Sequence, residues 1–215
     1  MEYLLAADVT LFLALNNLEW GMFGVMFFQT ITLMGNLPGV VILLLVCMGI
    51  HGQGRSRMAA ALVATMLLSV GVNAILKVTV QRPRPLIHFT STPTKTFAPP
   101  PEPGWGRERS HGPMQLRTRP LTKRSFPSGH AQYAFTWMVF MALLLPQGAI
   151  PFVTLACLVA LSRVVLGVHF PLDVVVGALC GTAFGWIGFT VGSAWERRAN
   201  PDCDPSDGED ACGVA

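Results

Sequence analysis

Three short groups of polar and charged residues interrupt an otherwise apolar sequence, and they hold the side chains best suited to chemistry. In chain order they are Lys77 with Arg84-Pro85, then Pro127-Ser128-Gly129-His130, then Ser162-Arg163 with His169 and Asp173. Lysine and arginine can bind an anion. An imidazole can act as a nucleophile, an acid or a base, and a carboxylate can orient it. The combination is therefore suited to reactions of an anionic group.

Each group stands at the end of an apolar segment. One helix is expected to end at the first group, the next helix to begin at the second, and the third group to lie between the following two helices. Two crossings of a membrane therefore separate each group from the next, so all three should meet on one side. Ionisable side chains at membrane depth are costly, which makes a shared functional site the preferred interpretation.

The composition is that of a membrane protein. Of the 215 residues, 52% are hydrophobic and 13% are charged, and the mean hydropathy is +0.50. Water-soluble domains rarely show this balance. No Lys or Arg precedes the first apolar stretch, so we expect no cleaved signal peptide. The net charge is a modest +3. We expect no nucleic-acid partner, and the oligomeric state is left open.

The apolar segments predict an all-α, integral-membrane helical bundle of five or six spans. Five spans are expected at about 38–53, 57–79, 129–146, 149–168 and 172–194. Prolines stand near several of the starts, where a missing backbone N–H does least harm. Residues 3–35 could form one further span or a pair of interfacial helices, and we favour six spans in total. One membrane domain should cover residues 1–198.

Two segments differ from the bundle. Residues 86–126 are rich in Pro, Gly, Ser and Thr, and they predict a long extramembrane insert that buries no core. The insert is basic and could recruit anionic headgroups, shield the site as a lid or serve only as a solvated linker; its cations are Lys95, Arg107, Arg109, Arg117, Arg119, Lys123 and Arg124. Residues 199–215 are acidic and are predicted to be disordered.

Together, the three groups resemble the three-part signature of the type 2 phosphatidic acid phosphatase superfamily, which includes vanadium haloperoxidases and glucose-6-phosphatase. Every signature residue is present, between Lys77 and Asp173. The resemblance implies a helical membrane phosphatase domain over residues 1–198 with a phosphate pocket at the helix ends. It also implies metal-independent hydrolysis of a phosphomonoester or diphosphate, without a cofactor.

The resemblance and elementary chemistry agree on the roles of the signature residues. Phosphate binding falls to Lys77, Arg84, Arg163, Ser128 and the N–H of Gly129. By resemblance His169 is the nucleophile that forms a phosphohistidine, Asp173 one helical turn later orients it, and His130 is the general acid. Arg82 is either a cation behind this site or a solvated loop charge.

The expected substrate is a phosphorylated lipid or isoprenoid in the bilayer, such as undecaprenyl diphosphate, phosphatidylglycerol phosphate, phosphatidic acid or a lipid A phosphate. Alternatives are a phosphotransferase that passes the phosphoryl group to another lipid, and a non-catalytic lipid-phosphate binder or transporter. A haloperoxidase is less favoured. A count of cations alone would place the basic insert and its flanks on the cytoplasmic side, whereas Arg55, Arg57, Arg197 and Arg198 indicate that the cytoplasm lies opposite the site. We favour the second interpretation, because the cations near the pocket have a catalytic reason to be there. We therefore expect a bacterial inner-membrane protein with its site facing the periplasm or exterior.

Overall fold

The computed structural model describes residues 2–36, 56–90, 104–121 and 123–199. Its elements are α1 (Glu2–Asn16), α2 (Gly21–Ile31), the 3-10 helix η1 (Thr32–Gly35), α4 (Ser56–Val80), α5 (Pro85–Thr90), β1 (Arg109–His111), β2 (Met114–Leu116), α6 (Gly129–Leu144), the 3-10 helix η3 (Pro146–Gly148), α7 (Ala149–Val165) and α8 (Pro171–Ala199). The predicted helical bundle is confirmed, with one addition: β1 and β2 pair as an antiparallel hairpin.

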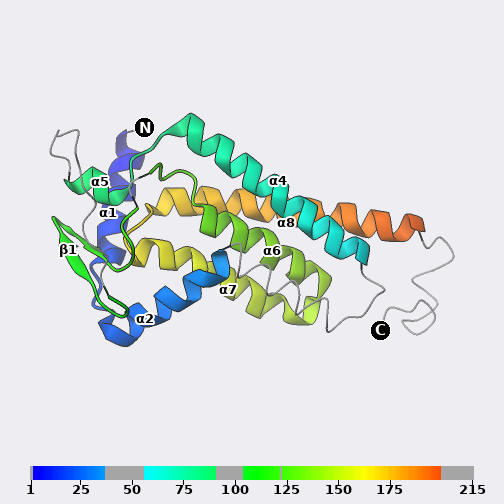
Figure 1. Ribbon diagram of the computed structural model, residues 1–215, viewed down its shortest axis with the longest axis horizontal. Helices are drawn as coiled ribbons and strands as arrows, with labels where there is room; N and C mark the ends of the chain where they lie inside the picture. The colour runs from blue at the N-terminus through cyan, green and yellow to red at the C-terminus, as the bar shows by residue number, and fades with distance from the viewer. Residues whose placement is uncertain (1, 37–55, 91–103, 122, 200–215) are drawn as a thin grey trace.

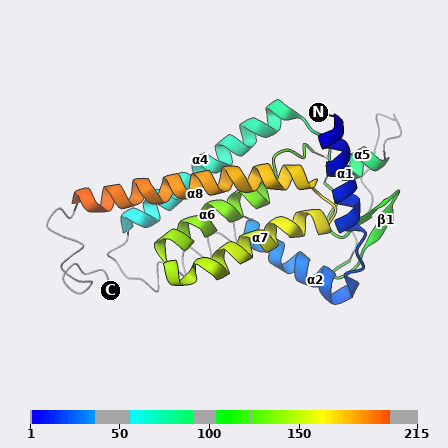
Figure 2. The ribbon, with the colours of Figure 1, turned by 180° about the vertical axis from the view of Figure 1, so that it is seen from behind.

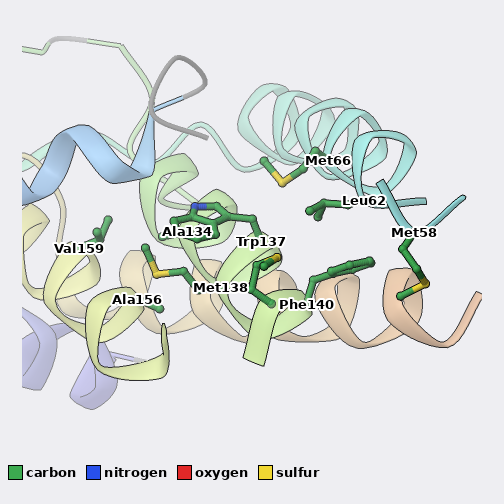
Figure 3. Packing of buried hydrophobic residues seen from close by; sticks show 10 residues of the cluster. Met58, Leu62, Met66, Ala134, Trp137, Met138, Phe140, Ala156 and Val159 are labelled. Atoms are coloured by element: carbon green, nitrogen blue, oxygen red, sulfur yellow. The ribbon is translucent and has the colours of Figure 1, made fainter. Parts of the chain in front are cut away.

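The long helices α4, α6, α7 and α8 form the bundle, and α6 contacts each of the other three (Figure 1). Figure 3 shows apolar side chains of α4, α6 and α7 meeting in its core. Met66 of α4, Trp137 of α6 and Val159 of α7 are buried there. Packing of these faces fixes the helix directions, and so brings particular helix ends together.

Close contact between α6 and α8 depends on glycine. Gly181 and Gly185 of α8 each lie against a backbone carbonyl of α6, and Gly177 lies against the carbonyl of Ser128, the N-cap residue of α6. A Cβ atom at Gly181 would collide with the carbonyl oxygen of Gln132 and lie 2.8 Å from Cβ of Phe135. Small residues allow helix backbones to approach in this way in membrane proteins.

A buried chain of polar side chains joins α4 to α6. Asn73 donates from Nδ2 to Oε1 of Gln132 at 2.7 Å, and Gln132 donates from Nε2 to Oγ of Ser69 at 3.0 Å. The hydroxyls of Ser69 and Thr136 are 3.2 Å apart. Because each group finds a partner, the chain can be buried, and it fixes the position of α4 along α6.

Three stretches among the described residues are long and apolar enough to cross a membrane: Arg57–Thr90, Pro146–Val165 and Pro171–Ala199. Helix α6 is shorter, with 16 residues. The span expected at 38–53 lies outside the described residues. Residues 3–35 form two short helices and η1 instead of one continuous span, because Gly21 adopts a positive φ of 60° just after α1 has ended. The total number of spans stays a prediction.

Helix α1, α5 and the hairpin lie at one end of the bundle, while α4 starts and α8 finishes at the other (Figures 1 and 2). The prediction that residues 86–126 bury no core is wrong, since Met114 and Leu116 are fully buried. The reason is a polar partner from α1: Asn16 accepts from the N–H of Gln115 at 2.7 Å and donates to its carbonyl at 3.0 Å.

Arg117 also belongs to the folded part of this insert. Its side chain is 1% exposed, and it donates to the backbone carbonyls of Asn16 at 2.5 Å and Val165 at 3.0 Å. It is therefore a structural cation that ties the hairpin to α1 and α7, and it is unavailable to recruit a headgroup.

The glycine contact between α6 and α8 can be tested with a matched pair of substitutions. Gly181→Ala should destabilise the protein by about 1–3 kcal/mol, because the new methyl group collides with α6. Gly71→Ala on α4 is the control, because a Cβ there meets nothing within 4 Å. Thermal unfolding in detergent measures both, and equal unfolding midpoints would contradict the packing described.

Candidate active site

The first signature group straddles the end of α4. Lys77 lies in its last turn, and Arg84 directly precedes α5. The Arg84 side chain is held by carbonyls from two other segments: Nε donates to Lys123 at 2.5 Å and Nη1 to Val168 at 2.8 Å. Nη1 also lies 3.1 Å from Nε2 of His169. A cation is thus fixed beside an imidazole nitrogen.

The turn between α7 and α8 delivers that imidazole. Gly167 follows the C-cap of α7 with a φ of 79°, and the N–H groups of Gly167 and Val168 donate to the carbonyls of Val164 and Arg163. This is the Schellman arrangement that ends a helix with glycine in the left-handed region. A Cβ atom at Gly167 would also collide with the carbonyl of Gln115. The tight turn places His169 two residues later, just ahead of α8.

The second nitrogen of His169 faces a hydroxyl and a carboxylate. Nδ1 lies 3.3 Å from Oγ of Ser125 and 3.6 Å from Oδ2 of Asp173. Ser125 donates its hydroxyl to the same carboxylate oxygen at 2.5 Å. An arginine can only donate, so Arg84 assigns the acceptor role to Nε2 and leaves the ring proton on Nδ1. The lone pair of Nε2 therefore points towards the guanidinium.

Asp173 is fully buried and has further partners. Its Oδ2 accepts from the N–H of Phe170 at 3.0 Å, and its Oδ1 accepts from Nη1 of Arg82 at 2.7 Å. Arg82 also pairs with Asp8 of α1 at 2.5 Å. The solvated-charge interpretation of Arg82 is wrong, because this guanidinium sits behind the site between two carboxylates.

Arg163, near the end of α7, is 4% exposed. Its Nη1 donates to Oγ1 of Thr32 in η1 at 2.5 Å. Among the described residues, its buried Nε has no hydrogen-bond partner. An unsatisfied buried donor is costly, and an anion beside Arg163 would remove this cost.

The second signature group opens α6. Ser128 is the N-cap and accepts from the N–H of Ala131, while its own N–H donates to the carbonyl of Asp173 at 2.9 Å. Gly129 follows, and a Cβ atom there would lie 3.2 Å from Oδ1 of Asn73. The first turn of α6 is thereby fixed against both α4 and α8, and a helix N-terminus of this kind favours an anion.

His130 and Lys77 complete the arrangement. His130 is close enough to interact electrostatically with Arg163, His169, Arg84 and Lys77. Lys77 in turn interacts with Arg84, Asp173 and Arg163. The structure thus brings together all eight predicted site residues from the three groups, at the end of the bundle that also carries α1. Their assigned roles remain predictions.

Sequence reasoning missed three members of the site. Ser125 contacts both His169 and Asp173, Thr32 holds Arg163, and Asp8 holds Arg82. Ser125 could have been noticed from its place just ahead of Pro127 and Ser128. The pattern around Asp8 is a weaker indication, because it is only a lone carboxylate within an apolar stretch. Thr32 gives no indication, because a single threonine in an apolar segment is common.

Burial and three cations govern the protonation of His169, which lies in the turn between two candidate spans. Burial lowers its pKa well below the usual value of 6.5, and the charges of Arg84, Arg163 and Lys77 lower it further. At neutral pH the imidazole is therefore uncharged, with an unprotonated nitrogen beside Arg84. An uncharged ring is the form that can act as a nucleophile.

The charges of the site do not cancel. The site holds four positive side chains and two negative ones, which leaves an excess of two positive charges. The positive side chains are Lys77, Arg82, Arg84 and Arg163, and the negative ones are Asp8 and Asp173. A surplus of this sign and size complements a phosphate group. The geometry and the electrostatics therefore both favour a bound phosphoryl group next to Nε2 of His169.

Comparisons with known proteins agree with this geometry. The family model of the PAP2 superfamily matches residues 58–197. The lipid A 1-phosphatase of Rhizobium etli is 33% identical over 73 residues, 34% of this chain and 30% of that protein. The undecaprenyl-diphosphatase of Sulfolobus acidocaldarius is 42% identical over 78 residues, 36% of each chain. The matched part thus spans about a third of these curated relatives.

Solved structures are similar over most of their length. The crystal structure of LpxE from Aquifex aeolicus superimposes with a TM-score of 0.64 and 27% identity, covering 85% of this chain and 94% of that one. The transmembrane PAP2-type phosphatidylglycerolphosphate phosphatase of Bacillus subtilis has a TM-score of 0.60 and 21% identity, covering 92% and 88% of the two chains. The second likeness is one of fold. With its apolar spans and the family match across the three signature groups, this chain is an integral membrane protein that belongs to the PAP2 superfamily.

Proposed function

We propose that this protein hydrolyses a phosphomonoester or diphosphate on a membrane lipid or isoprenoid, through a phosphohistidine on His169 and without a metal. One observation carries the proposal. Nε2 of His169 faces Arg84 at 3.1 Å, while Nδ1 faces Ser125 and Asp173 on the opposite side of the ring. One nitrogen is thus directed to the cations and the other is held by an acceptor, as nucleophilic catalysis requires.

The first chemical step is attack by the Nε2 lone pair on phosphorus. A P–N bond forms as the bond from phosphorus to the leaving oxygen breaks. His130, which takes up a proton when the anionic substrate binds beside it, gives that proton to the leaving oxygen. Lys77, Arg84 and Arg163 stabilise the charge that develops on the phosphoryl oxygens. Asp173 stabilises the positive ring that forms, because its carboxylate lies 3.6 Å from Nδ1.

The second step regenerates the enzyme. His130, now uncharged, accepts a proton from a water molecule as the water oxygen attacks phosphorus. The P–N bond breaks, inorganic phosphate leaves, and His169 returns to its neutral form. An acceptor lipid in place of water would give the phosphotransferase alternative, and phosphate release without any added acceptor separates the two.

The substrate class follows from the membrane setting and from the relatives. The site lies at one end of a bundle of apolar helices, where a lipid phosphate near the headgroup plane can reach it. Relatives that match part of this chain are named for lipid A and for undecaprenyl diphosphate. A lipid-linked phosphate or diphosphate in a bacterial inner membrane is the substrate class that these points support.

Orientation is part of the proposal. Arg57, Arg197 and Arg198 lie in the first turn of α4 and the last turn of α8, which is the end of the bundle away from the site (Figure 1). Basic residues favour the cytoplasmic side. The site would then face the periplasm or the exterior.

Replacing the nucleophile tests the proposal directly. His169→Asn should lower phosphate release from lipid phosphates by at least about 10³-fold, because no nitrogen remains to attack phosphorus. The assay is run with the purified protein in detergent, with chelator present. His88→Asn on α5 is the control, because it removes another imidazole near the site, one that packs against the rings of Phe89 and Phe170. Its loss of activity should be far smaller. A fully active His169→Asn variant would refute the nucleophile, and wild-type activity lost to chelator would refute metal independence.

Replacing the general acid should have an effect that depends on the leaving group. His130→Asn should slow cleavage of lipid phosphates by about 10²–10⁴-fold, because their alkoxide leaving groups need a proton. The leaving group of nitrophenyl phosphate needs no proton, so the rate of the first chemical step should fall much less with this substrate. Burst kinetics with both substrates measure this, and equal losses for the two would contradict the role of His130.

The lowered pKa of His169 predicts the acidic side of the pH profile. Because protonation of a buried ring between cations is disfavoured, the nucleophile stays uncharged as the pH falls through the usual histidine value of about 6.5. The acidic limb of kcat/KM, corrected for ionisation of the substrate phosphate, should therefore lie below that value. A limb at pH 7 or above assigned to His169 would contradict the environment described.

A further inference from the structure

Asp8 of α1 lies outside the region matched by the family model, residues 58–197, yet it contacts the residues around the site. Its Oδ2 accepts from Nη2 of Arg82 at 2.5 Å. Its Oδ1 accepts from the N–H of Leu172, in the first turn of α8, at 2.7 Å. The Asp8 side chain is 5% exposed and that of Arg82 is 14% exposed, so solvent cannot take over these contacts.

The contact with Leu172 supplies a cap that α8 lacks within its own sequence. Phe170, the residue before α8, has no side-chain acceptor for the free N–H groups of the first turn. Asp173 reaches back to the N–H of Phe170 at 3.0 Å, as the third residue of a capped helix often does. Asp8 accepts from the next free N–H and so acts as an N-cap donated by another helix.

The contact with Arg82 bears on the charge of the site. Arg82 divides its two terminal nitrogens between Asp8 and Asp173, and its guanidinium carbon lies 4.5 Å above the Phe170 ring. Without Asp8, one of these nitrogens would lose its carboxylate. The guanidinium would then draw on Asp173 more strongly, and the site would hold three excess positive charges instead of two.

Asp173 also interacts with the groups that orient His169. The same carboxylate accepts from Ser125 and faces Nδ1 of His169. If Arg82 pulled the carboxylate away from these partners, the imidazole would lose its orientation and the support for its positive form. An additional positive charge would also hold product phosphate more tightly.

We infer that Asp8 is a positioning residue, which pairs with one terminal nitrogen of Arg82 and caps the N-terminus of α8. In this way it keeps the carboxylate of Asp173 next to Nδ1 of His169, and it limits the positive charge that would retain product phosphate. Helix α1 is then part of the catalytic device, although the family match does not reach it. This inference rests on the proposed hydrolase function and adds a residue to it.

The test uses the full-length protein and separates charge from capping. Asp8→Asn retains an oxygen that can accept from Leu172 but removes the charge that pairs with Arg82. The variant should lose about 10-fold in kcat, the size of effect typical of a charged hydrogen bond. KM for the lipid phosphate should not rise, because the added positive charge attracts the substrate phosphate as well. Inhibition by inorganic phosphate should become about 10-fold stronger. A merely unstable variant would lose active protein without any change in this inhibition constant.

A control variant and a double variant complete the test. Thr10→Val, on the exposed side of α1, is the matched control and should match the wild type. In an Arg82→Gln background, Asp8→Asn should cost less than about twofold, because its target is gone. Wild-type kcat and phosphate inhibition in Asp8→Asn, or fully multiplicative losses in the double variant, would overturn the inference.

His169→Asn, assayed alongside, distinguishes a failure of the hydrolase proposal from a failure of the role assigned to Asp8. If it is inactive while Asp8→Asn behaves as the wild type, the role of Asp8 fails and the hydrolase proposal stands. If His169→Asn remains active, the proposed mechanism fails, and the role of Asp8 fails with it.

Discussion

The buried carboxylate of Asp173 is the point at which separate parts of the chain meet. It accepts from Arg82, Ser125 and the N–H of Phe170 and faces the imidazole of His169. The backbone carbonyl of the same residue accepts from Ser128 at the start of α6. A buried charge without partners costs several kcal/mol, so these segments can pack only if they bring their donors to this carboxylate.

Cations gathered at the end of an apolar bundle destabilise the fold, and hydrogen bonds and ion pairs to these cations offset this effect. Arg84 is tied to two backbone carbonyls, Arg163 is tied to Thr32, and Arg82 lies between two carboxylates. Tight packing of α6 against α4, α7 and α8 holds the ends in place. The cations are therefore fixed before an anion arrives, which is the condition for strong electrostatic stabilisation of a reacting phosphoryl group.

Much of this arrangement could be predicted from the sequence. The number of crossings between the polar groups predicts that Lys77, His130 and His169 meet, and they do, because that argument needs only the apolar segments and not their exact ends. Asp8 could not be placed in the same way. Its partner Arg82 is 74 residues away in the chain, and a lone aspartate near an N-terminus suggests an interruption of a helix before it suggests a site.

The insert shows a second limit of sequence reasoning. A stretch rich in glycine and proline is typical of a loop without a core. Here, however, Asn16 of α1 pairs with the N–H and the carbonyl of Gln115, and Arg117 of the insert donates to the carbonyls of Asn16 and Val165. These bonds satisfy backbone groups that would otherwise prevent burial of Met114 and Leu116. Such long-range polar pairing leaves no local pattern.

The central claim is that Nε2 of His169 takes the phosphoryl group. Rapid acid-free quenching of the enzyme with ³²P-labelled lipid phosphate, followed by peptide mapping by mass spectrometry, tests it most directly. The account predicts an alkali-stable, acid-labile phosphate on His169. Label on another residue, or turnover without a phosphoenzyme even when the second step is slowed, would contradict it.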